Sequence, residues 1–169
     1  MTNNQGQTLK VIQIGNSILR QTAQPVENFA DVGLQQLIDD LIDTAIASHG
    51  VGIAAPQVAQ SYRVFIVSSH PNPRYPDAPQ MPPTPMLNPE IVSHSETTIE
   101  GWEGCLSVPG KRGLVPRYKD IEVEYRDRDG ILHRQVFTDF IARIIQHELD
   151  HLNGILFCDR ALAFKDNLN

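Results

Sequence analysis

The sequence predicts an α+β fold in one domain spanning residues 1–169. Two stretches repeat apolar residues at three- and four-residue steps, which is the spacing of helices with one buried face. Between them, shorter runs show the composition and alternation of β-strands. The chain is long enough to bury one ordinary hydrophobic core, and no internal repeat is visible. These patterns favour helices and strands packed within a single unit.

The first helix is expected to begin near Asp31 and to end at Gly50. Aspartate often caps a helix because its side chain accepts a hydrogen bond from the first turn, and glycine often follows the last turn. The apolar stripe of this helix contains Val32, Leu34, Leu37, Ile38, Leu41, Ile42, Ala45 and Ile46.

Two strands are expected next, at residues 62–67 and 86–92. Residues 70–85, which separate them, contain seven of the twelve prolines. Proline lacks the N–H that a central strand needs, so this segment should be a solvent-exposed loop. Proline-rich segments are typically semi-rigid spacers, which favours a variable excursion over a functional lid.

A hairpin should follow. Ile121, Val123 and Tyr125 alternate with charged residues, the pattern of a strand with one face in water. The segment 128–130, Arg-Asp-Gly, then forms a turn into a second strand at 132–137.

The second helix covers the segment around residues 140–152. Thr138 or Asp139 can cap its start, and Gly154 can end it. Its apolar stripe contains Phe140, Ile141, Ile144, Ile145, Leu149 and Leu152.

This helix carries the pattern His-Glu-x-x-His at residues 147–151. His147 and His151 lie one turn apart, so both imidazoles can bind one divalent ion. Glu148 is rotated by about 100° around the helix axis, so it can stand beside a metal-bound water and act as a general base. The pattern alone leaves open the alternative that the two histidines are only packed or solvated.

A third ligand must come from elsewhere in the chain. The eighteen residues after His151 contain neither histidine nor glutamate, so the remaining choices are Cys158, an aspartate or a residue upstream. Cys105 is favoured because its surroundings are polar and rich in glycine, and thiolates bind borderline metals well. Cys158 lies in an apolar run and fits a small buried side chain better.

Three segments of the chain resemble the motifs of the peptide deformylase family. They are Gly50-Val51-Gly52-Ile53-Ala54-Ala55-Pro56-Gln57, Glu103-Gly104-Cys105-Leu106-Ser107 and Gln146-His147-Glu148-Leu149-Asp150-His151. The segments 15–20 and 112–117 are also similar, so the resemblance covers about residues 9–160. It implies antiparallel or mixed sheets packed around a central helix that carries the His-Glu-x-x-His motif. It also implies an enzyme that removes the N-formyl group from the initiator methionine of new polypeptides and releases formate.

The resemblance implies a role for each matched residue. Glu148 would take the proton of the metal-bound nucleophilic water and deliver it to the leaving amine. The side chain of Gln57 and the backbone N–H of Leu106 would stabilise the oxyanion. The cofactor would be one divalent metal ion per chain, natively Fe(II), although Zn, Ni or Co also suit this ligand set. The implied ligands are Cys105, His147 and His151.

The resemblance likewise implies how substrate binds. The segment Gly50, Val51, Gly52 and Ile53 would pair with an extended peptide in the manner of an added strand. The methionine side chain would enter an apolar pocket with Arg112 at its edge. The residues implied for this pocket are Val51, Phe140, Arg143, Ile144 and His147.

Composition limits the setting and the partners. Two distant cysteines and the lack of a signal peptide or long apolar run indicate a reduced, cytoplasmic setting without membrane insertion. The net charge of −6 argues against nonspecific nucleic-acid binding, and the basic cluster at 111–119 is expected to be a solvated loop. The expected partners are N-formylmethionyl nascent polypeptides. The short tail at 161–169 leaves transient contact with the ribosome open.

Two other functions compete with this interpretation. A general metallopeptidase would share the His-Glu-x-x-His chemistry but would cleave unformylated peptide bonds. A non-catalytic metal-binding module would need Cys105, His147 and His151, but it has no use for Glu148 or Gln57. The presence of the last two residues favours the enzyme.

Overall fold

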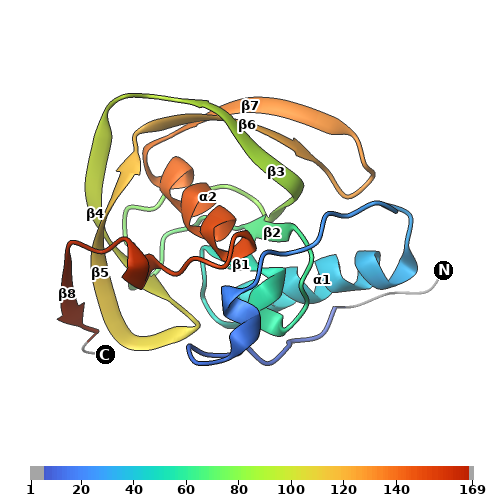
Figure 1. Cartoon of the computed structure of the whole chain (residues 1–169), viewed down its shortest axis with the longest axis horizontal. Helices are drawn as coiled ribbons and strands as arrows, with labels where there is room; N and C mark the ends of the chain where they lie inside the picture. The colour runs from blue at the N-terminus through green and yellow to red at the C-terminus, as the bar shows by residue number, and fades with distance from the viewer. Residues whose placement is uncertain (1–5, 168–169) are drawn as a thin grey trace.

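Two antiparallel sheets surround one helix in the computed structural model of the chain, which describes residues 6–167 (Figure 1). One sheet has the strand order β1-β2-β3-β6-β7 and the other has the order β4-β5-β8. The strands are β1 (Gly52–Ala54), β2 (Val64–Val67), β3 (Thr84–His94), β4 (Thr98–Cys105), β5 (Val108–Tyr118), β6 (Asp120–Arg126), β7 (Leu132–Thr138) and β8 (Ala163–Asp166). The helices are α1 (Val32–Ala47) and α2 (Asp139–Leu152), with short 3-10 turns η1 (Ser17–Arg20), η2 (Ala55–Val58) and η3 (Phe157–Asp159).

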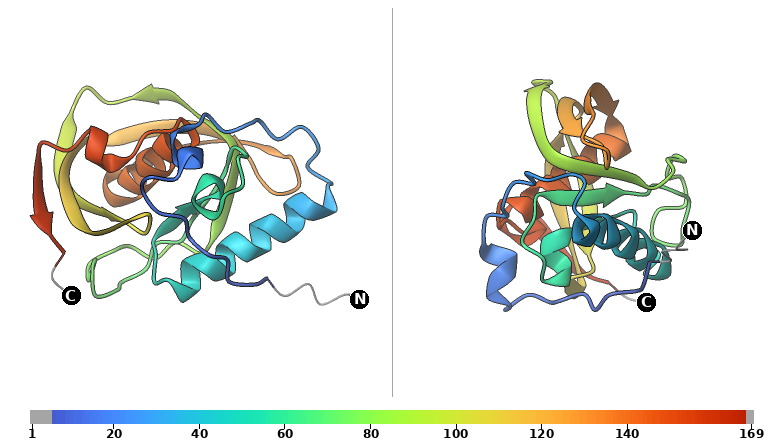
Figure 2. Two further views of the ribbon diagram at one scale, coloured as in Figure 1. Left: turned by 60° about the horizontal axis from the view of Figure 1, so that its bottom comes forward. Right: turned by 90° about the vertical axis from the view of Figure 1, so that its right-hand side faces the viewer.

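Helix α2 is the central element. It contacts β1, β2, β5, β6 and β7, and the left view in Figure 2 places it inside the curve of the strands. Its residues Ala142, Ile145 and Leu152 are fully buried in one core cluster with Phe65 and Met86. The α+β fold with a central helix is therefore confirmed. Neither helix within residues 6–167 is long and apolar enough to cross a membrane.

Strand β2 is apolar at every position because both of its faces are buried. Val64 and Ile66 pack in the cluster with α1, whereas Phe65 and Val67 pack in the cluster with α2. Successive side chains of a strand point to opposite faces, so a strand covered by helices on both sides has no wet face. This sandwich holds β1, which pairs with β2, between the two helices.

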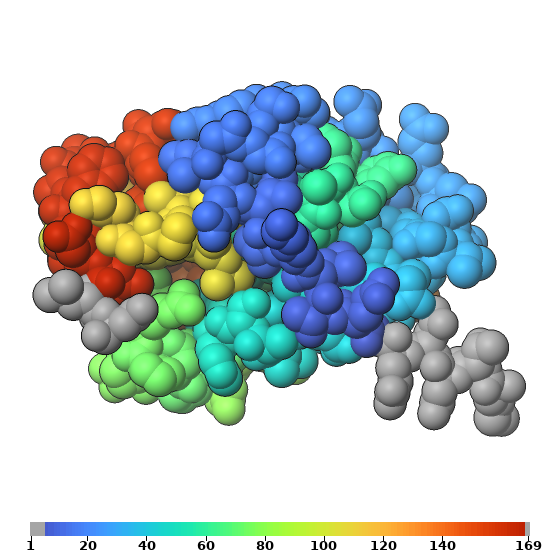
Figure 3. Space-filling model, turned by 90° about the horizontal axis from the view of Figure 1, so that it is seen from below, coloured from blue at the N-terminus to red at the C-terminus, as the bar shows by residue number. Residues whose placement is uncertain are grey.

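The N-terminal segment is hydrogen-bonded to two separate turns of the chain. Ile12 N donates to the carbonyl of Gln57 at 2.8 Å, and Ile14 N donates to that of Ser107 at 2.8 Å. Seen from below, this segment lies over the molecule next to the residues around 105–115 and 55–65 (Figure 3). It therefore ties the turn after β1 to the turn between β4 and β5.

The helix ends agree with the predictions except at one position. Asp31 caps α1 by accepting from Leu34 N at 2.8 Å, as expected. The helix ends at Ala47 rather than at Gly50, because His49 already adopts the left-handed conformation with φ of 52°. Gly50 N then donates back to Ala45 O at 3.0 Å, which closes the last turn.

The boundaries of α2 are confirmed. Thr138 occupies the cap position without a side-chain hydrogen bond. Asp139 follows in the left-handed region with φ of 52°. Gly154, with φ of 72°, lies just beyond the helix, as the sequence suggested.

The second predicted strand is longer than expected and includes proline. β3 begins at Thr84, so Pro85 belongs to a strand rather than to the loop. Pro85 pairs only with Ile66 of β2, because the pairing of β3 with β6 begins at Leu87. Further along, Pro89 falls at a register shift between Leu87 and Glu90, where no regular ladder bond is required. The predicted strand at 62–67 is shorter, starting at Val64.

The basic segment at 111–119 is a strand and not a solvated loop. It forms most of β5, which pairs with β4 on one side and β8 on the other. The sequence did not predict this strand because its glycines and prolines are typical of loops. Gly113 is needed because a Cβ there would lie 2.8 Å from the ring of Phe157. The predicted hairpin of β6 and β7 is confirmed, with Gly130 in its turn at φ of 81°.

The C-terminal part contains one unexpected strand. β8 lies within the segment 161–169 that was expected to be a short tail. Residues 1–5 and 168–169 of the predicted domain lie outside the described residues.

Candidate metal centre and active site

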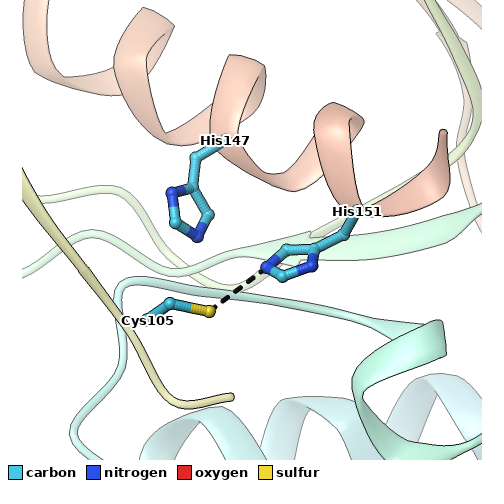
Figure 4. A group of neighbouring side chains, drawn as sticks. All are labelled: Cys105, His147 and His151. Atoms are coloured by element: carbon cyan, nitrogen blue, oxygen red, sulfur yellow. Dashed lines mark hydrogen bonds between the residues drawn. The ribbon is translucent and has the colours of Figure 1, made fainter. Parts of the chain in front are cut away.

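Cys105, His147 and His151 point toward one another although they come from two distant segments (Figure 4). The two histidines lie on successive turns of α2, and Cys105 ends β4. Their ligand atoms all lie within 4.8 Å of one another, and Cys105 Sγ is 3.4 Å from His151 Nε2. A tetrahedral ion with bonds of about 2.0–2.3 Å holds its ligand atoms roughly 3.5 Å apart. The cluster therefore fits one divalent metal with an open fourth position.

Cys158 lies outside this cluster. It is half-buried and packs against Val108, Val115, Leu156 and Phe157. Burial raises the pKa of its thiol, which disfavours the thiolate that metals require. This environment matches the expectation of a packed side chain.

Glu148 lies beside the cluster as a buried carboxyl group. Only 4% of the residue is exposed, and its Oε2 has no hydrogen-bond partner within residues 6–167. Burial raises the pKa of Glu148 to about 7. A general base works best when its pKa is near the working pH, so this environment suits proton transfer.

Gly52 of β1 makes room for this carboxyl group. A Cβ built on Gly52 would lie 2.6 Å from Glu148 Oε1 and 3.0 Å from Glu148 Cδ. Cβ atoms essentially never lie as close as 2.6 Å to another atom, so a side chain at this position would displace the Glu148 carboxyl group.

We expect Gly52→Ala to lower kcat by roughly 100-fold while the metal is retained, because small displacements of a catalytic group are costly. Gly33→Ala, in the first turn of α1 and outside the cavity lining, is the matched control, since the nearest atom that its Cβ would meet is a carboxylate oxygen of Asp31 at 3.1 Å. Metal content and kcat measured on both variants test this expectation. Equal losses in the two variants would contradict it.

Glu103 is a site residue to which sequence reasoning assigned no role. It is 3% exposed and its carboxylate accepts from His147 Nδ1 at 2.9 Å. A carboxylate on the outer nitrogen orients a metal-binding histidine and leaves Nε2 free for the ion. The sequence did contain a signal for this role, namely an acidic residue two positions before Cys105. A metal-binding histidine needs such an acceptor for its second ring nitrogen.

Two arginines hold Glu103 in place. Arg117 donates through Nε and Nη2 at 2.9 Å each, and Arg143 donates through Nη1 at 2.8 Å. Burial alone would raise the pKa of Glu103, but the hydrogen bonds from Arg117 and His147 outweigh it and hold the pKa well below its usual range. Arg117 also donates to Asp150 at 2.6 Å, which links this network to the second half of α2.

Gln57 lies in η2, directly after β1, and three contacts fix its side chain. Its Oε1 accepts from Ala54 N at 3.0 Å, and its Nε2 lies 3.1 Å from Ser107 Oγ and 3.5 Å from Cys105 Sγ. The amide donor therefore points toward the ligand cluster. Leu106 follows Cys105 in the turn between β4 and β5 and also borders the cavity.

A cavity opens beside the cluster, and most residues predicted to bind substrate line it. Gln57, Leu106, Cys105, His147 and Glu148 line it as well. The predicted substrate residues at its wall are Gly50, Val51, Gly52, Phe140, Arg143 and Ile144. Ile53 is not among the lining residues, because its side chain is fully buried in the cluster with α1. Arg112 also lies outside the lining, in contact with Tyr75.

The proline-rich loop contributes to this cavity, contrary to the expectation of a mere spacer. Arg74 and Tyr75 line it. The Tyr75 ring packs on Phe140 with 4.9 Å between centroids, and the Arg112 guanidinium lies 5.1 Å from the Tyr75 centroid. Sequence reasoning missed Arg74 and Tyr75 because proline content indicates exposure but not what the loop touches. His49 and Gly104 are two further lining residues that it missed.

These features together define a class of protein. A metal cluster with one open position, a buried carboxylate beside it and an adjoining cleft is the arrangement of a metal-dependent hydrolase.

Comparison with known proteins narrows the class to one family. The family model described as polypeptide deformylase matches residues 8–167. The chain belongs to this family, the hydrolases that remove the N-formyl group from new polypeptides during protein biosynthesis.

Individual relatives agree along nearly the whole chain. Peptide deformylase 2 of Nostoc sp. is 65% identical over 161 residues, which is 95% of this chain and 88% of that protein. The class I type b peptide deformylase of Acinetobacter baumannii, crystallised with Met-Ala-Ser bound, superposes with a TM-score of 0.88 at 50% identity, covering 90% of this chain and 98% of that one. Peptide deformylase of Thermotoga maritima gives 0.82 at 35% identity, covering 92% and 99%.

Proposed function

We propose that this chain hydrolyses the formamide bond of N-formylmethionyl nascent polypeptides with Glu148 as general base and then general acid. The observation that carries the proposal is the buried Glu148 carboxyl with one unpartnered oxygen beside Cys105, His147 and His151. A divalent metal held by these three residues would polarise the formyl oxygen and lower the pKa of water toward about 7. Glu148 takes the proton from the attacking water. It then delivers this proton to the nitrogen of methionine as the C–N bond breaks, which leaves formate and a free amine.

The developing oxyanion needs donors from the chain itself. Gln57 Nε2 already points toward Cys105, and the backbone N–H of Leu106 lies in the adjacent turn. A single preorganised donor of this kind typically contributes about 3 kcal/mol to the barrier. Because Ala54 N holds the Gln57 amide by its oxygen, the N–H group is already directed at the site before substrate arrives.

Peptide substrate is proposed to pair with the outer edge of β1. Within residues 6–167, β1 pairs with β2 alone, so its other edge is open to an added strand. Gly50, Val51, Gly52 and Ile53 supply this edge. The methionine side chain enters the cavity between Val51, Phe140 and Ile144. Tyr75, which contacts Arg112, lines the same cavity. The Met-Ala-Ser peptide bound to the Acinetobacter baumannii relative supports this choice of ligand.

The proposed metal is Fe(II), with Zn, Ni or Co also compatible with two histidines and one cysteine. The proposed compartment is the cytoplasm, where nascent chains emerge. Transient contact with the ribosome stays a prediction.

The direct test is formate release from N-formyl-Met-Ala-Ser by anaerobically purified protein whose metal content is measured on the same sample. We expect formate in proportion to bound metal and no cleavage of Met-Ala-Ser itself. Cleavage of unformylated peptides at a similar rate would instead identify a general metallopeptidase. A metal-loaded protein that releases no formate would refute the proposal.

We expect the iron form to lose activity in air, because Fe(II) and the Cys105 thiolate are both oxidisable in a site that is open to water. The nickel form should keep its turnover in air, because Ni(II) is far less readily oxidised. Time courses of formate release in air and under argon for both forms measure this difference. Identical decay of the two forms would show that metal oxidation is not the cause.

A further inference from the structure

The part of the proline-rich loop from Asn72 to Tyr75 is a closed turn. The backbone N–H groups of Arg74 and Tyr75 both donate to the Asn72 side chain, at 3.0 and 3.1 Å. The backbones of Asn72 and Tyr75 also exchange two hydrogen bonds, of 3.1 and 3.0 Å. Pro73 occupies the second position of this turn, where its ring fixes φ at the value that the turn requires. The backbone that carries Arg74 is therefore preorganised.

Tyr75 anchors this turn to the body of the protein. Its ring packs on Phe140 with 4.9 Å between centroids, and the Arg112 guanidinium lies 5.1 Å from its centroid on another side chain's approach. Arg74 and Tyr75 both line the site cavity. The anchored turn thus holds Arg74 at the wall of the cavity.

Arg74 brings an unpaired positive charge to this wall. Its residue is exposed, and it takes part in none of the ion pairs formed by residues 6–167. The acids of the cavity lining are Glu103, which is paired with Arg143, and Glu148, of which only 4% is exposed. A guanidinium with free donors is a typical partner of a carboxylate, so this charge suits an anionic group of a ligand.

The surroundings of β1 set the direction in which substrate runs. Glu148 lies against Gly52, so the formyl group belongs at this point of the strand. Beyond Ala54 the chain turns into η2, and the Gln57 side chain already bonds Ala54 N at 3.0 Å. Substrate residues after methionine therefore run from Gly52 toward Gly50.

The loop that carries Arg74 leaves the sheet at this same end. Val67, the last residue of β2, pairs with Gly52, and Ser68 N donates to Val51 O at 2.8 Å. The loop begins directly after these contacts. Arg74 is thus placed near the substrate residues that follow methionine.

We propose that Arg74 is a specificity-determining residue that binds the carboxylate of an acidic side chain within two residues after the formylated methionine. The inference rests on the proposed function and deepens it by naming a substrate class. That class is nascent chains with aspartate or glutamate directly after methionine or one residue further on. The methionine side chain is apolar, so the charge of Arg74 acts on the residues beyond it.

The test uses pairs of formylated tetrapeptide amides that differ by one charge. The first pair is N-formyl-Met-Glu-Ala-Ala-amide and N-formyl-Met-Gln-Ala-Ala-amide. The second pair is N-formyl-Met-Ala-Glu-Ala-amide and N-formyl-Met-Ala-Gln-Ala-amide. Glutamine has nearly the size of glutamate, and the terminal amide leaves the glutamate side chain as the sole anion of the peptide.

We expect the wild type to favour glutamate over glutamine by about threefold or more in kcat/KM in at least one pair, which is the range of an exposed ion pair. The difference should lie in KM, because the contact is remote from the bond that breaks. Arg74→Gln should bring the ratio to about one, whereas Arg74→Lys keeps the charge and should keep most of the preference. High salt should weaken the preference of the wild type, because it screens exposed charges.

Arg134→Gln is the matched control. It changes the net charge of the protein by the same amount as Arg74→Gln, but Arg134 lies on β7 and outside the cavity lining. This variant should keep the ratios of the wild type. An equal loss of preference in Arg134→Gln would overturn the inference, because the cause would then be the overall charge.

Two other results would also overturn the inference. One is a wild-type ratio of about one in both pairs, and the other is a preference for glutamate that survives in Arg74→Gln. If the metal-loaded wild type releases no formate from any of the four peptides, the proposed function fails, and this inference fails with it. Equal release from both members of each pair refutes the inference alone.

Discussion

Replacing Glu148 by alanine should reduce formate release by several orders of magnitude while about one metal ion per chain remains bound. The carboxyl group moves the proton in both halves of the proposed reaction, and general acid–base catalysis acts together with activation of the water. It is also separate from the ligand cluster of Cys105, His147 and His151. The measurement is kcat for N-formyl-Met-Ala-Ser together with metal analysis.

Two further variants make this result specific. Glu148→Gln keeps the shape of the side chain but cannot accept a proton, so it should be nearly as inactive as the alanine variant. Glu96→Ala removes an exposed glutamate between β3 and β4 and should leave kcat unchanged. Near-normal turnover in Glu148→Gln, or loss of metal from it, would mean that the role of Glu148 is misassigned.

The two cysteines should respond very differently to substitution by serine. Cys105→Ser replaces a thiolate by a hydroxyl, which is a poor metal ligand at neutral pH, so both bound metal and activity should fall strongly. Cys158→Ser changes a half-buried packing residue and should cost about 1 kcal/mol of stability with metal retained. Metal per chain, formate release and thermal unfolding of both variants provide the comparison.

The Cys158 variant is the control for the loss of a thiol as such. If both variants keep their metal and their activity, the ligand set of two histidines and one cysteine is wrong. Loss of metal from the Cys158 variant alone would move the third ligand to that residue.

Much of the local structure follows from short-range patterns. The stripe from Val32 to Ile46 predicted α1 and its start near Asp31. The alternation at Ile121, Val123 and Tyr125 predicted the hairpin. Such features depend on residues within one or two turns of each other, so periodicity in the sequence records them directly.

The strands that the sequence did not predict are those whose conformation depends on residues distant in the chain. β5 contains two glycines and two prolines among basic residues, yet it pairs on both edges and buries Arg117 between Glu103 and Asp150. Nothing near Arg117 in the sequence shows that two acids from other elements will neutralise it. Pro85 is tolerated in β3 because the strand has only one neighbour at that point, which is a property of sheet register.

The residues of the candidate site also divide into those that the sequence predicted and those that only the tertiary structure identified. By itself the sequence determined that His147, Glu148 and His151 share one helix with the spacing of a metal-binding motif, because a helix converts sequence spacing into angle and height. The polar, glycine-rich surroundings of Cys105 favoured it over Cys158 as the third ligand, and the family resemblance added the role of Gln57. Only the tertiary structure decided that Glu103 orients His147, that Tyr75 reaches the cavity from a proline-rich loop, and that Arg143 turns toward Glu103 rather than into solvent. These contacts join residues far apart in the chain, and their distances are set by strand register and helix packing, which no local pattern of residues encodes.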